Sequence, residues 1–386
     1  MDTKSNEIES SATVKTSRRG FLKTSAVAAG AAIGMGASSI STVHAAKPKS
    51  SKGLPITIAG YKNDRVEALM DGRVQVNGFD ARFEEDGIGA MNTHIFSGPK
   101  TREITEIGLS PFMLAYANEG FRDYTLIPVF PFRVFRHKSI FVRTDSDIKS
   151  PADLRGKKVA TSGYSSTSLT WLRGIIQHEY GVKPEEIQWY ISSKDSVDVK
   201  LSGGVSKQEQ VMPKNIQLTS GPAGMDESEM LVSGKVDALL HAAEPKAYVE
   251  GNPRITRLFT NFRTVEHAYF AKTGLFPIMH AVAVRRDVID AHPGLPKAIF
   301  NAFSQAKKLM YEEQKLLWLR MSLPWIAQEV EETRALMGEN YFPYGIEPNR
   351  KALDALFQYS YEQGLAKKRL TIEELFHPST LELIEA

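Results

Sequence analysis

Residues 150–181 read SPADLRGKKVATSGYSSTSLTWLRGIIQHEYG. The stretch divides into four predicted elements: a short helix opening at 150–154, a strand over 157–160, a loop of small residues over 162–168, and an amphipathic helix over 169–180 that ends at Gly181. Glycine is a common residue just past a helix end. A strand that leads through a short loop into a helix is the repeating unit of an α/β protein.

The same alternation extends through most of the chain. Further strands are predicted at 54–60, 79–84, 104–109, 126–130, 139–143, 187–191, 216–219, 236–240 and 278–285, and the chain after residue 295 reads as mostly helical. Strands separated by helices predict largely parallel sheets, whose ligands lie beyond the carboxyl ends of the strands. The chain after residue 45 is too long for one ordinary core, so we expect two lobes.

The composition excludes several kinds of site. The chain has 48 Lys and Arg residues against 45 Asp and Glu residues, which gives no electrostatic case for a nucleic-acid partner. It has no cysteine, so disulfides, thiolate metal sites and a cysteine nucleophile are excluded. No stretch after residue 45 has the 18 or more apolar residues that a membrane span needs.

The N-terminal segment carries an export signal. Ser17–Lys23 reads SRRGFLK, an apolar stretch follows over 26–40, and the small residues of Val43–Ala45 fit a signal peptidase site. This pattern predicts export by the twin-arginine machinery, cleavage near Ala45 and a periplasmic protein. We exclude residues 1–45 from fold reasoning and assign 46–53 to a linker.

A series of motifs carries a family resemblance: DR at 64–65 and DGRV at 71–74, IPVFP at 127–131, FRHKSI at 135–140, SPADLRGK at 150–157, WLRGI at 171–175, GKVDA at 234–238, FPIMH at 276–280, LPW at 323–325, YGI at 344–346 and ELF at 374–376. In this order the chain resembles the 4,5-dihydroxyphthalate decarboxylase family, which has the type 2 periplasmic-binding-protein fold. PADLxGK and GxVDA are common to that fold, whereas FRH and FPIMH are narrower.

The resemblance implies an α/β fold of two lobes, each a mostly parallel sheet flanked by helices, with a helical C-terminal region. We expect 54–133 and about 310–386 to form lobe I, and 134–309 to form lobe II. The resemblance also implies a carboxy-lyase activity without a cofactor. The loop between residues 191 and 216 is longer than the family pattern.

Two functions follow from these observations. The first is a solute-binding protein that captures a small organic anion, such as an aromatic or dicarboxylic acid, for an ABC-type importer permease. The second is a lyase similar to 4,5-dihydroxyphthalate decarboxylase that removes CO2 from an aromatic carboxylate. One fold can host both roles, and the export signal places the receptor first.

Candidate ligand-binding residues are polar side chains near predicted strand ends, helix starts and the crossing between lobes: Tyr61, Asp64, Arg65, Ser110, Arg133, Arg136, His137, Tyr164, Ser166, Thr167, Ser168, His241, Glu244 and His280. A guanidinium matches a carboxylate with two parallel hydrogen bonds. Hydroxyls and free N–H groups at a helix start favour an anion. Each candidate also has a structural alternative, such as a helix cap for Asp64 or an ion pair across the hinge for either arginine.

The histidines are the candidates for proton transfer. If the protein is a lyase, His137, His241 or His280 together with Glu244 would supply the proton. A lone histidine near apolar residues is more often a structural hydrogen bonder. A metal site assembled from these four residues stays open, although we expect no metal.

Overall fold

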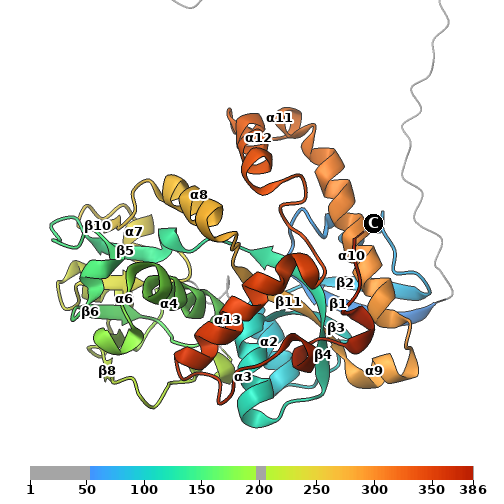
Figure 1. Cartoon of the computed structure of the whole chain (residues 1–386), viewed down its shortest axis with the longest axis horizontal. Coiled ribbons are helices and arrows are strands. Elements are labelled where there is room, and N and C mark those ends of the chain that lie inside the picture. The colour runs from blue at the N-terminus through green and yellow to red at the C-terminus, as the bar shows by residue number, and fades with distance from the viewer. Residues whose placement is uncertain (1–52, 197–205, 386) are drawn as a thin grey trace, which may run out of the picture. The chain divides into compact units, whose positions relative to one another are not determined.

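The computed structural model describes residues 53–196 and 206–385 (Figure 1). The predicted export motif at 17–23, the cleavage position near Ala45 and the linker up to residue 52 lie outside these residues. The segment 197–205, part of the long loop expected after residue 191, lies outside them as well. None of the described helices combines the length and the apolar character of a membrane span.

The first sheet has five strands in the order β2-β1-β3-β11-β4. These are β1 (Leu54–Gly60), β2 (Phe79–Glu85), β3 (Ile104–Gly108), β4 (Tyr124–Arg133) and β11 (Ile278–Arg285). β1 pairs in parallel with β2 and β3, whereas β11 runs antiparallel to both β3 and β4.

The second sheet has six strands in the order β10-β5-β9-β6-β7-β8. These are β5 (Ile140–Arg143), β6 (Lys158–Thr161), β7 (Gln188–Ile191), β8 (Leu218–Ser220), β9 (Ala238–Leu240) and β10 (Ile255–Arg257). The pairs among β6, β7, β8 and β9 are parallel, and β5 is antiparallel to β9 and β10.

Helices flank both sheets (Figure 1). The α-helices are α1 (Glu67–Met70), α2 (Ile88–Phe96), α3 (Leu109–Glu119), α4 (Thr167–Tyr180), α6 (Glu227–Val232), α7 (Lys246–Val249), α8 (Phe262–Thr273), α9 (Arg286–Ala291), α10 (Leu295–Gln314), α11 (Leu317–Arg320), α12 (Ile326–Met337), α13 (Arg350–Glu362) and α14 (Ile372–Leu375). Six 3-10 turns complete the described elements: η1 (His137–Ser139), η2 (Pro151–Leu154), η3 (Pro184–Glu186), η4 (Lys207–Gln210), η5 (Glu347–Asn349) and η6 (Pro378–Thr380).

The α/β class and the two flanked, mostly parallel sheets agree with the prediction. Each sheet is mixed because one strand runs against the others, β11 in the first sheet and β5 in the second. One detail differs from the prediction: 278–285, expected in lobe II, is the fourth strand of the first sheet. An apolar run predicts a buried strand but carries no information about which strand it pairs with. The chain therefore returns from the second sheet to the first before Ile278 and not near residue 309.

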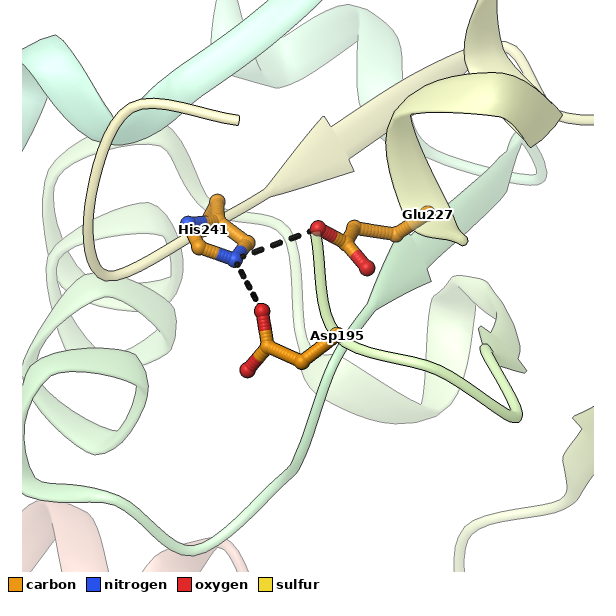
Figure 2. Close-up of side chains that lie close together, drawn as sticks. All are labelled: Asp195, Glu227 and His241. Atoms are coloured by element: carbon orange, nitrogen blue, oxygen red, sulfur yellow. Dashed lines mark hydrogen bonds and ion pairs between the residues drawn. The ribbon is translucent and has the colours of Figure 1, made fainter. Parts of the chain in front are cut away.

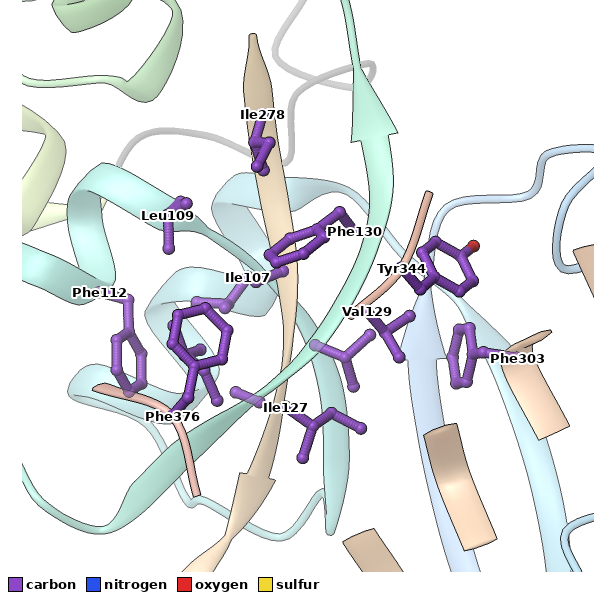
Figure 3. Packing of buried hydrophobic residues seen from close by; sticks show 14 of the residues in the cluster. Ile107, Leu109, Phe112, Ile127, Val129, Phe130, Ile278, Phe303, Tyr344 and Phe376 are labelled. Atoms are coloured by element: carbon purple, nitrogen blue, oxygen red, sulfur yellow. The ribbon is translucent and has the colours of Figure 1, made fainter. Parts of the chain in front are cut away.

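The centre of the first sheet is formed by β3, β4 and β11, which are buried on both faces, as expected for strands covered on both sides. Figure 3 shows Ile107, Ile127, Val129 and Phe130 of β3 and β4 packed among side chains from α3, α10 and the C-terminal segment. In that segment His377 donates its backbone N–H to the Leu126 carbonyl at 2.8 Å. The end of the chain thus packs on the first sheet.

The C-terminal helix α13 also contacts the second lobe. Gln363, just after α13, accepts a hydrogen bond from Arg173 Nε of α4 at 2.9 Å and donates one to the Thr170 carbonyl at 2.9 Å. All three residues are buried. A Cβ added to Gly174 of α4 would overlap the ring of Tyr359 in α13. Glycine at this position therefore lets the two helices approach closely.

Candidate functional site

A cavity of about 450 Å³ lies where segments of the two sheets meet. Its lining comes from the end of β1, from α2, from the β4-to-β5 connection, from α4, from the loop after β9 and from β11: Tyr61, Ile88, Phe132, Val134, Arg136, Lys138, Ser139, Ser168, Ala242, Ala243, Glu244 and His280. Most of these positions are strand ends or the loops that follow them, where α/β proteins bind ligands. The volume suits a small organic molecule.

Arg136 gives the cavity an unpaired positive charge. Its Nη1 donates to the Ala242 carbonyl at 2.7 Å and its Nη2 contacts the sulfur of Met279 at 3.0 Å. Nε has no hydrogen-bond partner among the described residues, none of which places a carboxylate within ion-pair distance of the guanidinium. Burial lowers the pKa of Arg136 to about 9. A buried cation without a counter-ion is costly, so this position favours a bound anion.

His280 lines the same cavity and is held by a buried carboxylate. Its Nδ1 lies 2.6 Å from Glu106 Oε1, and Glu106 Oε2 accepts the backbone N–H of Tyr61 at 2.9 Å. Glu106 is 3% exposed. The carboxylate fixes the proton on Nδ1 and leaves Nε2 without a partner among the described residues, so Nε2 is available for proton transfer.

Aromatic rings pack around His280. The Phe132 ring centroid lies 4.9 Å from that of His280, and the Tyr61 centroid lies 5.5 Å from it. The Tyr61 hydroxyl accepts the backbone N–H of Ile88 at 3.3 Å, and burial raises the pKa of Tyr61 to about 12. Phe132 and Tyr61 thus offer flat apolar surface beside the histidine.

The local sequence explains why His280 lies at an irregular point of the sheet. The β4–β11 ladder shifts register on both sides of the His280–Phe132 pair. Pro128 and Pro131 lie in this part of β4, and proline cannot donate a ladder hydrogen bond. Such irregularities commonly reorient a side chain next to a functional site.

Glu244 and Lys138 add further charge to the lining. Glu244 accepts a hydrogen bond from Arg257 Nη2 at 2.7 Å. Burial alone would raise the pKa of Glu244, but this contact and the nearby Lys138 lower it. Glu244 is therefore an ionised acceptor at the cavity wall.

His241 follows β9 directly but does not line the cavity. Figure 2 shows its ring between two carboxylates, with Nε2 3.3 Å from Asp195 Oδ1 and 3.3 Å from Glu227 Oε1. Burial alone would lower the pKa of His241, but the hydrogen bonds with Asp195 and Glu227 raise it to about 10. These three are the residues whose donor atoms lie close enough together to hold a metal ion, within the described chain.

The structure does not assemble the metal site that the sequence left open, from His137, His241, Glu244 and His280. His241 contacts Asp195 and Glu227, Glu244 pairs with Arg257, and His280 pairs with Glu106. His137 is 2% exposed and packs on the Tyr269 ring, 4.9 Å between centroids. Burial lowers the pKa of His137 to about 4, so His137 is a neutral, buried residue outside the cavity lining.

Arg133 also lies outside the lining. Its Nη1 donates to Asn349 Oδ1 at 2.6 Å and its Nη2 donates to the Phe276 carbonyl at 2.5 Å. Arg133 ends β4, whereas Arg136 follows the strand. Arg133 therefore holds the C-terminal segment against the sheet, with no acidic partner among the described residues.

Of the predicted hydroxyl turn, only Ser168 reaches the cavity lining. Ser166 caps α4 by accepting the Leu169 N–H at 3.4 Å, and Thr167 accepts the Ser110 N–H at 3.0 Å. Ser110 Oγ donates to the Ser165 carbonyl at 2.9 Å. The remaining Tyr164 is buried beneath the Arg173 guanidinium, 3.6 Å from its ring centroid. The turn thus ties α3 to α4.

Asp64 and Arg65 pair with each other at 2.7 Å outside the cavity lining. Arg65 Nε donates to the Pro131 carbonyl at 3.0 Å. The N-cap of α1 is Val66, so the alternative of Asp64 as the helix cap is wrong. Of the predicted ligand-binding residues, the cavity brings together Tyr61, Arg136, Ser168, Glu244 and His280.

Sequence reasoning missed Glu106, Asp195 and Glu227. Glu106 had a visible signal, because a carboxylate in the middle of an otherwise apolar strand needs a partner. Asp195 and Glu227 are ordinary acidic positions of a loop and a helix start in the sequence. Only the fold brings them to His241.

Two relatives and one family model match the sequence. A 4,5-dihydroxyphthalate decarboxylase from Comamonas testosteroni is 32% identical over 335 residues, which cover 85% of this chain and 98% of the relative. A second 4,5-dihydroxyphthalate decarboxylase, from Pseudomonas putida, is 30% identical over 206 residues, which cover 53% of this chain and 76% of that relative. A family model described as NMT1/THI5 like matches residues 135–205.

Among solved structures, a periplasmic sulfonate-binding protein from Methylobacillus flagellatus superposes with a TM-score of 0.51 and 14% identity. The match covers 85% of this chain and 93% of that protein. At this identity the similarity concerns the fold alone, which is the periplasmic-binding-protein fold.

Proposed function

Since the chain belongs to the 4,5-dihydroxyphthalate decarboxylase family, we propose that it is a carboxy-lyase that removes CO2 from a hydroxylated aromatic carboxylate. One observation carries this proposal: the unpaired Arg136 and His280, which Glu106 supports from behind, line the same cavity. Arg136 binds an anion, and His280 supplies a proton.

The lining matches the chemistry of such a substrate. Arg136 and Lys138 favour a carboxylate, and Tyr61 with Phe132 provides flat surface for an aromatic ring. The ionised Glu244 can accept a hydrogen bond from a ring hydroxyl. Each group of the substrate class therefore has a complementary group in the lining.

The proposed reaction breaks the bond between the ring carbon and the carboxylate carbon. The electron pair of that bond stays on the ring carbon, CO2 leaves, and His280 Nε2 delivers a proton to the ring carbon. Glu106 stabilises the positively charged imidazolium that donates the proton, as a carboxylate partner does for a catalytic histidine. Solvent then returns the proton to His280.

A second function, capture of a small organic anion for an ABC-type importer, is favoured by the twin-arginine motif at Ser17–Lys23 and by the fold. In that role the protein would be periplasmic and would bind without turnover. The export motif alone ranks the receptor first. The His280–Glu106 pair reverses the order, because a receptor needs the cation but not a supported proton donor.

Turnover and binding of 4,5-dihydroxyphthalate by the purified protein test the proposal. We expect CO2 release together with saturable binding by calorimetry. Binding without CO2 release would support the receptor instead, and absence of both would contradict both functions for this class of ligand.

A matched pair of arginine variants tests the anion site. Arg136→Met removes a charge-assisted contact worth about 1.5–3 kcal/mol, so the dissociation constant should rise roughly 10- to 150-fold. Arg133→Met removes an equally buried guanidinium outside the lining. It should lower stability and leave affinity close to that of the wild type. Equal losses in both variants would remove Arg136 from the site.

A further inference from the structure

A cluster of three side chains lies next to the cavity wall but outside the cavity lining. His241 follows β9, Asp195 lies in the loop after β7, and Glu227 begins α6 (Figure 2). We propose that these three residues bind one divalent transition-metal ion, with Zn²⁺ as its simplest representative. This site is separate from the proposed lyase chemistry and does not depend on it.

The spacing of the donor atoms fits coordination of such an ion. His241 Nε2 lies 3.3 Å from Asp195 Oδ1 and 3.3 Å from Glu227 Oε1, and the three donor atoms lie within 4.8 Å of one another. Bonds of about 2.0–2.2 Å in a tetrahedral site separate neighbouring ligand atoms by roughly 3.3–3.6 Å. One imidazole and two carboxylates also form a ligand set that Zn²⁺ accepts.

Outer contacts orient two of the ligands. His241 Nδ1 lies 2.9 Å from the Ala243 carbonyl oxygen and 3.0 Å from the Ala243 backbone nitrogen, so contacts with one residue hold this side of the ring and leave Nε2 facing the carboxylates. Ser192 Oγ donates to Glu227 Oε2 at 3.2 Å, and the backbone N–H of Ser196 donates to Oε1 at 3.1 Å. A metal-bound histidine usually donates its other N–H to a carbonyl or carboxylate, and metal-bound carboxylates are themselves hydrogen bonded.

The charge and burial of the cluster suit a divalent ion. Glu227 is fully buried and His241 is 2% exposed. His241 Nε2 lies at the same 3.3 Å distance from both carboxylates, which carry up to two negative charges between them. A divalent ion with neutral imidazole brings the same set to zero and contacts both carboxylates, which lowers the cost of burial.

The ion would join three segments that are distant in sequence: the loop at 192–196, the start of α6 and the end of β9. His241 leads directly into Ala242, Ala243 and Glu244, which line the cavity. A metal at this position would therefore stabilise one wall of the cavity from behind.

The test is a Zn²⁺ titration of the full chain after removal of metal by a chelator and removal of any affinity tag. We expect one ion per chain by elemental analysis and calorimetry, and Co²⁺ in its place should give visible absorption bands of a low-symmetry site. Asp195→Asn and His241→Gln should each weaken Zn²⁺ binding by more than the roughly 10- to 100-fold that loss of an outer-shell partner costs.

His178→Gln is the matched control, because His178 Nε2 contacts a single carboxylate, Glu362 Oε2, at 2.7 Å. It should leave Zn²⁺ binding unchanged. The Asp195 side chain is 35% exposed, so Asp195→Asn keeps the test valid even if His241→Gln fails to fold. Absence of stoichiometric binding, or binding that Asp195→Asn leaves unchanged, would overturn the proposal.

Discussion

Glu106→Gln tests whether the carboxylate behind His280 serves catalysis. Glutamine has nearly the same shape, but it offers one acceptor and one donor where Glu106 accepts from both His280 Nδ1 and the Tyr61 N–H. If the amide oxygen faces His280, the amide NH2 meets the Tyr61 N–H. If the amide is reversed, it donates to Nδ1 and forces the other tautomer. Either orientation loses a charge-assisted hydrogen bond worth about 1.5–3 kcal/mol.

We therefore expect kcat to fall roughly 10- to 150-fold, measured as CO2 release from 4,5-dihydroxyphthalate. The dissociation constant should change much less, because Arg136 is untouched. Glu103→Gln is the control, since Glu103 also accepts a backbone N–H, from Thr57 at 2.9 Å, but lies outside the cavity lining. Wild-type turnover in Glu106→Gln, or the same loss in Glu103→Gln, would refute the role of this carboxylate.

Three further variants test the packing around the site, each by urea denaturation. Ser110→Ala removes a buried hydrogen bond to the segment before α4 and should lower the free energy of unfolding by about 1 kcal/mol. Weaker ligand affinity in this variant would show instead that Ser110 contacts the ligand. Burial holds the pKa of His137 at about 4 in the folded protein, against about 6.5 in the unfolded chain. The free energy of unfolding therefore falls by about 3 kcal/mol as the pH drops from 6.5 toward 4. His137→Phe should lose less stability than the wild type between pH 7 and 4.5, and an equal loss would contradict this. Gly174→Ala should lower the free energy of unfolding by about 1–3 kcal/mol, because the added methyl overlaps the Tyr359 ring. Gly294→Ala is the control and should not lower it, because the space around Gly294 is open.

The order of strands and helices could be predicted because apolar periodicity and glycine punctuation are local properties of the sequence. The prediction of 278–285 as a strand is correct, yet its assignment to lobe II is wrong. Pairing is decided by contacts between β11 and the distant strands β3 and β4. Periodicity within one segment does not contain that information.

The candidate site was predictable in part for a similar reason. Arg133 and Arg136 lie in one cationic and aromatic run, and the same chemistry suggested a ligand for both. The strand ends at Arg133 and the chain then turns, so only Arg136 reaches the cavity lining. The position of a strand end is poorly fixed by sequence, and it decides which of two neighbouring side chains meets a ligand.

The proposed lyase also constrains which carboxylate Arg136 binds. Decarboxylation turns an anion into neutral CO2, so a cation that holds the leaving carboxylate stabilises the ground state more than the transition state and slows the reaction. Arg136 accelerates the reaction only if it anchors a different carboxylate and leaves the departing one near the apolar Phe132 and Val134. A cavity with one deeply buried guanidinium therefore favours an aromatic dicarboxylate as substrate, in which one carboxylate is retained and the other leaves.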